Sequence, residues 1–206
     1  FNPDAEIDNN TCEYSDGVYE CDGVTCINDA DGDGICDEIE SLAVCQLGVV
    51  YVSEAHTSGE PADYIEIYNS GTEDCLLTGF QIDDNVELAD LTFGTVLIEA
   101  GGYWLGYEDA PGSFTSGLSS GGDLVVFADP QGNTLIVEAG PSVGNLSKSY
   151  DAEGNGCYTN PTPGAANDAC GVVGCTDETA CNFNPEATHH DGSCSFSDGI
   201  LDCAGT

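Results

Sequence analysis

The stretches Val49-Val50-Tyr51-Val52 and Tyr64-Ile65-Glu66-Ile67-Tyr68 decide the fold, because their apolar residues recur with a period of two. Five further runs have the same character, at 75–77, 95–98, 103–105, 124–127 and 134–137. Turn residues separate these runs, and Asp129-Pro130-Gln131-Gly132-Asn133 should form the tip of one hairpin. About seven short strands without a helical stretch predict an all-β, antiparallel β-sandwich.

The composition places this sandwich in an oxidising environment. The chain has 206 residues, enough for one medium domain with small appendages, and 12 cysteines. A reducing cytosol would not maintain so many disulfides, so we expect a secreted protein in the extracellular space or at the cell surface. No signal peptide and no apolar run of membrane length is present, so direct membrane insertion is not expected. Because the sequence starts inside a repeated motif, we expect any secretion signal to lie outside it.

The charge of the chain is extreme. It has 38 acidic residues, one Lys and no Arg, which gives a formal net charge of −37. Such a surface repels nucleic acid and anionic membranes, and both are excluded as partners. The surface also repels itself, so the fold should depend on bound or condensed cations, most simply Ca²⁺.

A repeated segment occupies the two ends of the chain. Residues 183–206 are an imperfect copy of residues 1–24, identical at ten of the 24 positions, with Cys194 on Cys12 and Cys203 on Cys21. Self-similarity of this kind predicts a tandem array. Each end would hold half of a module that the other end completes, either within one polyprotein or between separate subunits. A head-to-tail contact that does not close into a ring gives a filament of neighbouring copies.

An acidic loop near the first copy has the spacing of a calcium site. The run from Asn28 to Glu40 fits D-x-D-x-D-G-x-x-D-x-x-E, and Gly34 allows its sharp turn. Oxygen ligands would come from Asp29, Asp31, Asp33, the carbonyl of Ile35, Asp37 and Glu40. The alternative is a solvated acidic turn. No entering helix precedes the loop, which resembles the single calcium loops of thrombospondin type 3 repeats, dockerins and EF-hands, with a short helix over about 37–44. Such a loop would stiffen a joint between domains.

The C-terminal cysteines belong to a motif of their own. Gly174-Cys175-Thr176-Asp177, followed by Ala180-Cys181-Asn182-Phe183-Asn184-Pro185 and Asp191-Gly192-Ser193-Cys194, resembles a short cysteine module. That module recurs in large secreted proteins of marine Bacteroidetes-type bacteria. The resemblance covers about 30 residues.

The central part of the chain resembles the lamin-tail domain. Six segments follow the pattern of that family in order, namely 52–55, 63–71, 77–82, 121–126, 146–148 and 160–167. The run Pro161-Thr162-Pro163-Gly164-Ala165-Ala166-Asn167 is the most specific of them. The resemblance spans about Val49 to Asn167 and implies an immunoglobulin-like sandwich that is appended to secreted bacterial proteins as a non-catalytic module.

This sequence departs from the lamin-tail pattern in its cysteines. Cys75 and Cys157 lie inside the resemblance, and Cys45 and Cys170 lie at its borders. The simplest pairings would be Cys75 with Cys157 and Cys45 with Cys170. The second pairing would close a loop of over a hundred residues, which stabilises by about 4 to 5 kcal/mol in the chain-entropy model.

The only basic residue, Lys148, stands where the lamin-tail pattern usually has Arg or Lys. We expect it to be partly buried against a carboxylate, Glu66 or Glu54. The alternative is an isopeptide crosslink from its amine to an Asp or Asn, which would remove one water or ammonia from the mass.

Two polar clusters in the C-terminal module allow a metal site or a plain turn. His189, His190 and Asp191 would be an exposed loop, since the first copy has Ile7, Asp8 and Asn9 at these positions. Asp177, Asn184 and Asp191 would form either a second Ca²⁺ site or an Asp-rich turn.

Catalytic motifs are absent from the sequence. It contains no G-x-S-x-G, no metal-binding His-x-x-x-His and no phosphate-binding Gly-Lys loop, and each Cys has a plausible disulfide role. The sequence therefore predicts a protein that is not an enzyme.

The predicted organisation has four parts. They are a partial cysteine module at 1–24, a calcium loop with a short helix at 25–45, a lamin-tail-like sandwich at 46–170 and a cysteine module at 171–206. The predicted function is that of a structural repeat in a bacterial surface fibre. The alternatives are an adhesin or accessory module that binds a glycan or another surface ligand, and an acidic coat protein that buffers calcium or binds mineral.

Overall fold

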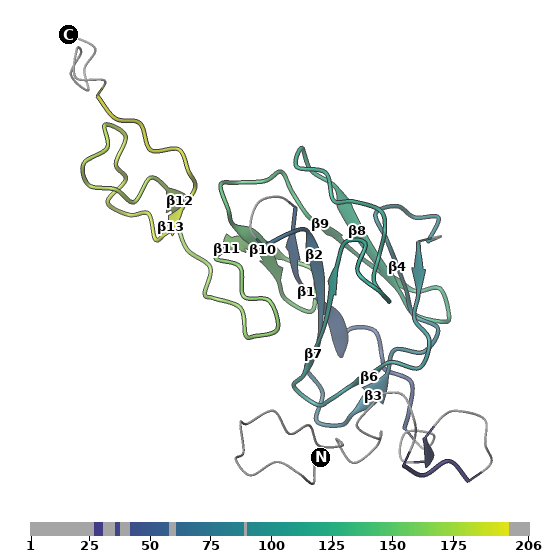
Figure 1. Ribbon diagram of the computed structural model, residues 1–206. Helices are drawn as coiled ribbons and strands as arrows, with labels where there is room; N and C mark the ends of the chain where they lie inside the picture. Colours follow the sequence, from purple (N-terminus) through teal and green to yellow (C-terminus); the bar gives the residue numbers. More distant parts are fainter. Residues whose placement is uncertain (1–26, 31–35, 38–41, 58–60, 89, 198–206) are drawn as a thin grey trace, which may run out of the picture. The chain divides into compact units, whose positions relative to one another are not determined.

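A computed structural model describes residues 27–30, 36–37, 42–57, 61–88 and 90–197. The chain divides into two compact units, Phe1–Ala43 and Val44–Thr206, and each is described here by itself. In the part of the chain that the structure describes, no helix is long and apolar enough to cross a membrane. In the described part of the second unit, all of the regular secondary structure is β-strand, as Figure 1 shows.

The larger sheet of the second unit has five strands. Its order is β11 (Gly156–Thr159), β10 (Ser147–Tyr150), β1 (Val50–His56), β2 (Tyr64–Asn69) and β7 (Tyr103–Tyr107), and every neighbouring pair is antiparallel. The pairing of β1 with β2 shifts register between Val52 and Glu54, which marks a β-bulge.

The second sheet has four strands. Its order is β5 (Leu91–Thr92), β4 (Gln81–Asp83), β8 (Leu124–Ala128) and β9 (Thr134–Glu138), again all antiparallel. The predicted hairpin between β8 and β9 is confirmed, because Asp129 accepts the backbone N–H groups of Gln131 and Asn133 on one carboxylate oxygen. A small antiparallel pair, β3 (Cys75–Leu76) with β6 (Leu97–Ile98), completes the sandwich.

One hydrophobic core joins the two sheets. It contains Val52 and Ile67 from the five-stranded sheet and Ile82, Phe127 and Val137 from the four-stranded sheet, all nearly or fully buried. Phe80 and Phe127 stack with ring centroids 5.0 Å apart. The alternating pattern of the sequence therefore places one face of each strand in this core, and the prediction of an antiparallel immunoglobulin-like sandwich is confirmed.

Two disulfides of the sandwich differ from the predicted pairing. Cys45 bonds to Cys75, and Cys157 bonds to Cys170. The predicted pairs Cys75–Cys157 and Cys45–Cys170 are therefore wrong. Each observed bond joins cysteines that are local in sequence, 30 and 13 residues apart. The position of Cys45 beside β3 explains the first bond. The Cys45 N–H donates to the carbonyl of Leu76, which is next to Cys75 in β3.

The predicted short helix is also shorter than expected at its C-terminal end. Asp37 is helical, but Leu42 and Ala43 are not, and Val44 forms an isolated bridge with Leu76. Residues 38–41 lie outside the described residues. Pairing of Val44 with the sandwich replaces the last turn that the sequence predicts.

The C-terminal module contains one short parallel pair, β12 (Val173–Gly174) with β13 (His189–His190). The disulfide Cys175–Cys194 joins the segments that directly follow these strands. Asx turns at Asp177, Asn184 and Asp191 shape the loops of the module.

Candidate functional site

The predicted calcium loop is described only in part. Asp29 and Asp37 lie in the described residues, whereas Asp31, Asp33, Ile35 and Glu40 lie outside them. The Asp37 N–H donates to the carbonyl of Asn28 over 3.1 Å, and Asp37 Oδ1 accepts the N–H of Ala30 over 2.9 Å. These two bonds hold the ninth position of the loop, Asp37, to the two residues that flank the first position, Asp29. The ligand set itself stays a prediction.

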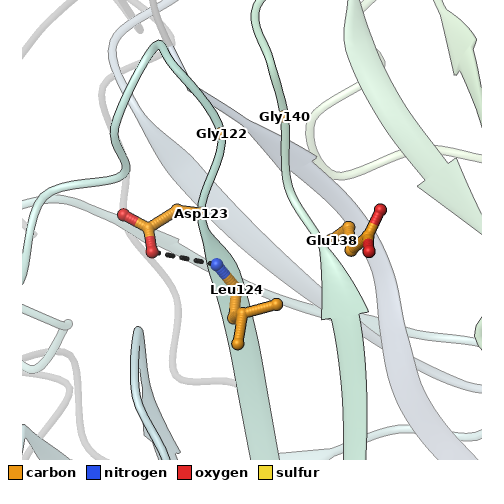
Figure 2. Close-up of a pocket in the computed structure, with 5 residues that line it drawn as sticks. All are labelled: Gly122, Asp123, Leu124, Glu138 and Gly140. Atoms are coloured by element: carbon orange, nitrogen blue, oxygen red, sulfur yellow. Dashed lines mark hydrogen bonds between the residues drawn. The ribbon is translucent and has the colours of Figure 1, made fainter.

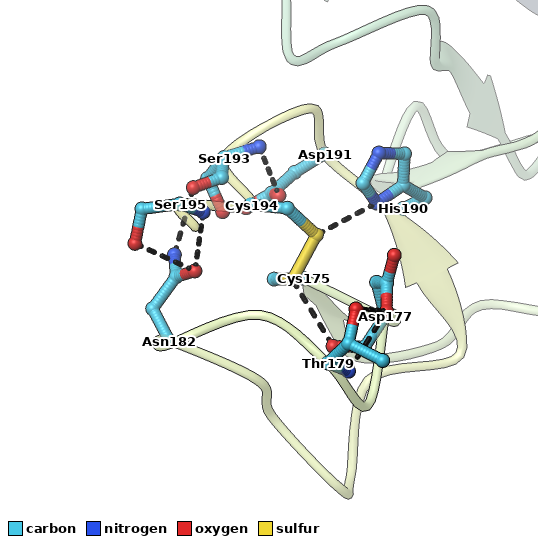
Figure 3. Close-up of a disulfide and its surroundings, with 9 residues drawn as sticks. All are labelled: Cys175, Asp177, Thr179, Asn182, His190, Asp191, Ser193, Cys194 and Ser195. Atoms are coloured by element: carbon cyan, nitrogen blue, oxygen red, sulfur yellow. Dashed lines mark hydrogen bonds between the residues drawn. A yellow bond between two sulfur atoms is a disulfide. The ribbon is translucent and has the colours of Figure 1, made fainter. Parts of the chain in front are cut away.

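The predicted cluster of Asp177, Asn184 and Asp191 in the C-terminal module consists of turns in the structure. Asp177 Oδ1 accepts from Thr179, and Asp191 Oδ1 accepts the N–H of Ser193, which Figure 3 shows. These hydrogen bonds lower the pKa of both aspartates. Asn184 accepts the N–H of Glu186 in the same way. Across the described residues, no group of three or more His, Cys, Asp or Glu side chains is arranged to hold a metal ion.

His189 and His190 differ from the expected exposed loop. Both lie on β13, and His189 is buried with its Nδ1 2.9 Å from the hydroxyl of Thr188. His190 is exposed, and its Nδ1 lies 3.8 Å from Cys194 Sγ of the disulfide in Figure 3. The two side chains differ because β13 pairs with β12, and successive side chains of a strand point to opposite sides.

The expected partner of Lys148 is also wrong. Its amine lies over the ring of Tyr158, 5.9 Å from the centroid, on the neighbouring strand β11. Side chains alternate along β10, so Lys148 projects to the face opposite that of Ser147 and Ser149. Glu54 pairs in register with Ser149, and it therefore lies on the other face of the sheet from Lys148.

A pair of buried glutamates is the most unusual feature of the sandwich. Glu54 on β1 and Glu66 on β2 are directly opposite in register, and both are fully buried. They lie on the outer face of the five-stranded sheet, because the intervening residues Ile65 and Ile67 face the core. The chain has no Arg, and its single Lys lies over Tyr158, so neither carboxylate has a basic partner of that kind.

Neutral donors surround the two carboxylates. Glu54 accepts from the hydroxyl of Ser147, from the N–H of Thr162 over 3.0 Å and from the hydroxyl of Thr162 over 3.1 Å. Glu66 accepts from the hydroxyl of Ser53 over 2.6 Å and from the N–H of Gly164 over 2.7 Å. Because all of these groups point hydrogen atoms at the carboxylates, the arrangement suits carboxyl groups and not a bound cation.

The segment that supplies these donors is held by its own turn. The N–H of Ala165 donates to the carbonyl of Thr162 over 2.9 Å, and Gly164 has a φ of +77°. Pro at the second position and a left-handed Gly at the third are the features of a type II turn. Asn167 donates to the carbonyl of Ser53, so the segment 161–167 is fixed to β1 at both of its ends.

Burial sets the electrostatics of this glutamate cluster. Loss of hydration, opposed by the hydrogen bonds from Ser53 and Gly164, raises the pKa of Glu66 to about 7. Burial also lowers the pKa of His56, whose ring stacks on Tyr64 with centroids 5.5 Å apart. The phenol pKa of Tyr64 is raised by burial and by the nearby Glu54.

Sequence reasoning missed this cluster, although one signal was present. Glu66 alternates with Ile65 and Ile67, which places it on the outer face, where a glutamate is ordinary. Glu54 has the spacing of the core residues Val50 and Val52, and the β-bulge after Val52 turns it to the outer face. Only the packing of residues 161–167 against this face buries them. The signal is the run Pro161–Asn167, which is the most specific part of the lamin-tail resemblance. This run lies over the two carboxylates and donates hydrogen bonds to both.

A second surface feature lies at the end of the β8–β9 hairpin. Gly122, Asp123, Leu124, Glu138 and Gly140 line an open pocket of about 370 Å³, shown in Figure 2. Asp123 accepts the N–H groups of Leu124 and Ser119, while Glu138 is exposed. The pocket thus offers carboxylates and a partly exposed Leu124 to solvent.

The fold defines a class of protein, an immunoglobulin-like β-sandwich with disulfide bonds at its borders and in the C-terminal module. The family described as Lamin Tail Domain matches residues 46–141. Lamin tail domains form a non-enzymatic fold family. No curated protein and no solved structure matches the chain.

The family match covers β1 to β9 and ends before β10. The sequence resemblance extends further, to Asn167, and residues 142–167 therefore lie outside the matched part. They nevertheless complete the five-stranded sheet and cover its outer face. Three disulfides in the described residues indicate an oxidising, extracellular environment.

Proposed function

We propose that the protein is a structural repeat of an extracellular surface fibre, in which lamin-tail sandwiches alternate with cysteine modules. The observation that carries this proposal is the recurrence of one module on both sides of the sandwich, with Cys194 aligned on Cys12 and Cys203 on Cys21. An alternation of module and sandwich is the pattern of a linear array.

The sandwich is suited to act as a rigid spacer in such an array. The disulfide Cys45–Cys75 ties the entry of the chain into the sandwich to β3, and Cys157–Cys170 ties β11 to the exit. Bonds at both borders transmit force between the two ends of the domain with little extension of the chain.

The joint between module and sandwich would be stiffened by calcium. The loop from Asp29 to Glu40 has the full oxygen set of a calcium loop, and the hydrogen bonds of Asp37 close its described part. A divalent cation in this loop would also reduce the self-repulsion of a chain with a net charge of −37.

Size measurement of the full chain tests the proposal. In millimolar calcium we expect linear assemblies by sedimentation and negative-stain electron microscopy, and we expect chelator together with reductant to release single chains. Glu40→Gln should prevent assembly in calcium, whereas the matched surface variant Glu99→Gln should assemble normally. A chain that stays a monomer under all of these conditions, both singly and as two copies joined in tandem, contradicts the proposal.

A second candidate function is binding of a glycan or another surface ligand. Tyr51, Tyr68 and Tyr103 form a half-buried row across β1, β2 and β7, with ring centroids 5.8 Å and 4.8 Å apart. Aromatic rows on a sheet face are common in ligand sites. Binding of the isolated monomer on a glycan array, abolished by Tyr68→Ala, would favour this function over the fibre. An array without a hit on the monomer argues against it.

A further inference from the structure

We propose that residues 160–167 form a proton-dependent latch, which stays closed over the five-stranded sheet while Glu66 carries a proton and opens locally when that proton leaves. This inference concerns a switch inside the sandwich and does not depend on assembly into a fibre. It rests on the burial of Glu54 and Glu66 and on the donors that the latch supplies to them.

The site must hold a proton when the latch is closed. Two directly opposed side chains of an antiparallel pair have Cβ atoms about 4.5 to 5.5 Å apart. Like charges at this distance, both shielded from water, disfavour each other strongly. One of the two buried carboxyl groups is therefore neutral in the closed state.

No other group nearby compensates a second negative charge. The titratable side chains around the pair are His56 on β1, Tyr64 on β2 and Tyr103 on β7. Strand β10 contributes Ser147 and Ser149, and the latch contributes Thr162, Gly164 and Asn167, all of them neutral. Only His56 can become a cation, and its burial opposes that change.

Glu66 is the group that holds the proton. Glu54 accepts hydrogen bonds from three donors of the latch and β10, including two from Thr162. Glu66 has only the Ser53 hydroxyl and the Gly164 N–H. The pKa of Glu66, raised to about 7 by burial, supports the same assignment.

The latch responds to this proton because its turn donates directly to both carboxyl groups. A neutral Glu66 still accepts the N–H of Gly164, so the closed turn satisfies both groups. An ionised Glu66 gains hydration when residues 160–167 lift away, so ionisation favours opening. The disulfide Cys157–Cys170 holds the ends of the segment, which keeps the opening local and reversible.

Amide hydrogen exchange in the full chain tests the latch. If Glu66 has its ordinary pKa of 4.5 in the open state and a pKa of about 7 in the closed state, opening increases about 30-fold between about pH 5.5 and about pH 8.5. The amides of Thr162 and Gly164 should lose that much protection, after correction for the intrinsic exchange rate. Amides of the core strand β8 should keep theirs.

Glu66→Gln supplies the decisive variant, because glutamine is neutral at every pH and has nearly the same shape. Its latch amides should change protection by less than about threefold over the same range. The exposed control Glu99→Gln should behave like the unchanged chain. An unchanged pH response in Glu66→Gln overturns the proposal.

A measurement on the unchanged chain covers the case in which Glu66→Gln does not fold. Side-chain ¹³C NMR of the glutamates should show one carboxyl that titrates near neutral pH, with the amide shifts of Thr162 and Gly164 following the same midpoint. A set of glutamates that all titrate near their ordinary value, or latch amides with pH-independent protection, overturns the proposal.

Discussion

Asn69 illustrates how a single side chain joins three segments of the sandwich. It is fully buried at the end of β2, and its Nδ2 donates to the carbonyls of Glu73, Ile98 and Glu99 at 3.0, 3.2 and 3.1 Å. Its Oδ1 accepts the N–H of Gly71 over 2.9 Å. Asn69 therefore fixes the end of β2 to the turn after it and to the end of β6.

Replacing the Asn69 side chain tests how much these hydrogen bonds contribute to the stability of the sandwich. Asn69→Asp keeps the shape but turns an oxygen toward the three carbonyls and buries a charge, so we expect a loss of about 3 kcal/mol or more in the free energy of unfolding. Chemical denaturation followed by intrinsic fluorescence measures it. Gln131→Glu adds the same charge at the exposed hairpin tip and should change stability by less than about 0.5 kcal/mol. Equal effects of the two variants would contradict this role.

Lys148 and the two glutamates show which residue-level features the sequence can specify. The strand of Glu66 was predictable from alternation, and so was the outer face on which Glu66 lies between Ile65 and Ile67. The strand of Lys148 was not, and Glu54 reaches the outer face only through the β-bulge that follows Val52. The burial of the two glutamates was not predictable, because it depends on residues 161–167, which are about a hundred positions away in sequence. The opposed charges of Lys148 and Glu66 predicted an ion pair, but strand register places them on opposite faces.

The turn Thr162–Ala165 is the element on which the glutamate cluster depends. Gly164 has a φ of +77° and directs its N–H to Glu66, and a methyl group added there would meet nothing within 4 Å. Substitution is therefore penalised by backbone conformation and not by a collision.

We expect Gly164→Ala to lower the free energy of unfolding by about 1 kcal/mol through this backbone strain. Thermal unfolding by circular dichroism measures the change. Gly94→Ala is the matched control, since Gly94 also has open space around it but no left-handed φ. A neutral or stabilising Gly164→Ala would contradict the type II turn.

The two disulfides of the sandwich give a prediction about connectivity. Non-reducing peptide maps after cleavage at acidic residues should show Cys45 linked to Cys75 and Cys157 linked to Cys170. Removing both cysteines of the first pair, which closes the longer loop, should cost about 3 to 4 kcal/mol, and removing the second pair about 3 kcal/mol. Peptides linking Cys75 to Cys157 would contradict the structure.

At the level of elements, the sequence predicts the apolar strands and fails on the polar ones. Strands β1, β2, β3, β6, β7, β8 and β9 all coincide with predicted apolar runs. The strands at Ser147–Tyr150 and Gly156–Thr159 were missed, because serine, glycine and threonine carry little of the apolar signal that marks a strand. The predicted disulfide pairing was wrong for another reason, because the spacing of cysteines in a sequence does not determine which of them pair.

At the level of the whole molecule, the scarcity of basic residues has a testable consequence. Trypsin can cut only after Lys148, and this residue lies on β10, which pairs with β1 on one side and β11 on the other. We expect the folded chain to resist trypsin and to yield the fragments 1–148 and 149–206 only above its unfolding temperature, as seen by mass spectrometry. Rapid cleavage of the folded chain would contradict the pairing of β10 with a strand on each side.

Several features of the whole molecule suit an oxidising, extracellular environment. Disulfides hold both borders of the sandwich, a turn from the C-terminal part of the sandwich satisfies the two buried glutamates, and the charged residues are almost all acidic. We propose in addition that repeated modules join such sandwiches end to end, with calcium at the joint.

Electron microscopy of the secreted native material, labelled with an antibody against the sandwich at 46–170, tests that claim most directly. The account predicts filaments that carry the label at regular intervals along their length and that fall apart after chelation and reduction. Label found only on dispersed, compact particles, with no filament bearing it in the presence of calcium, would contradict it.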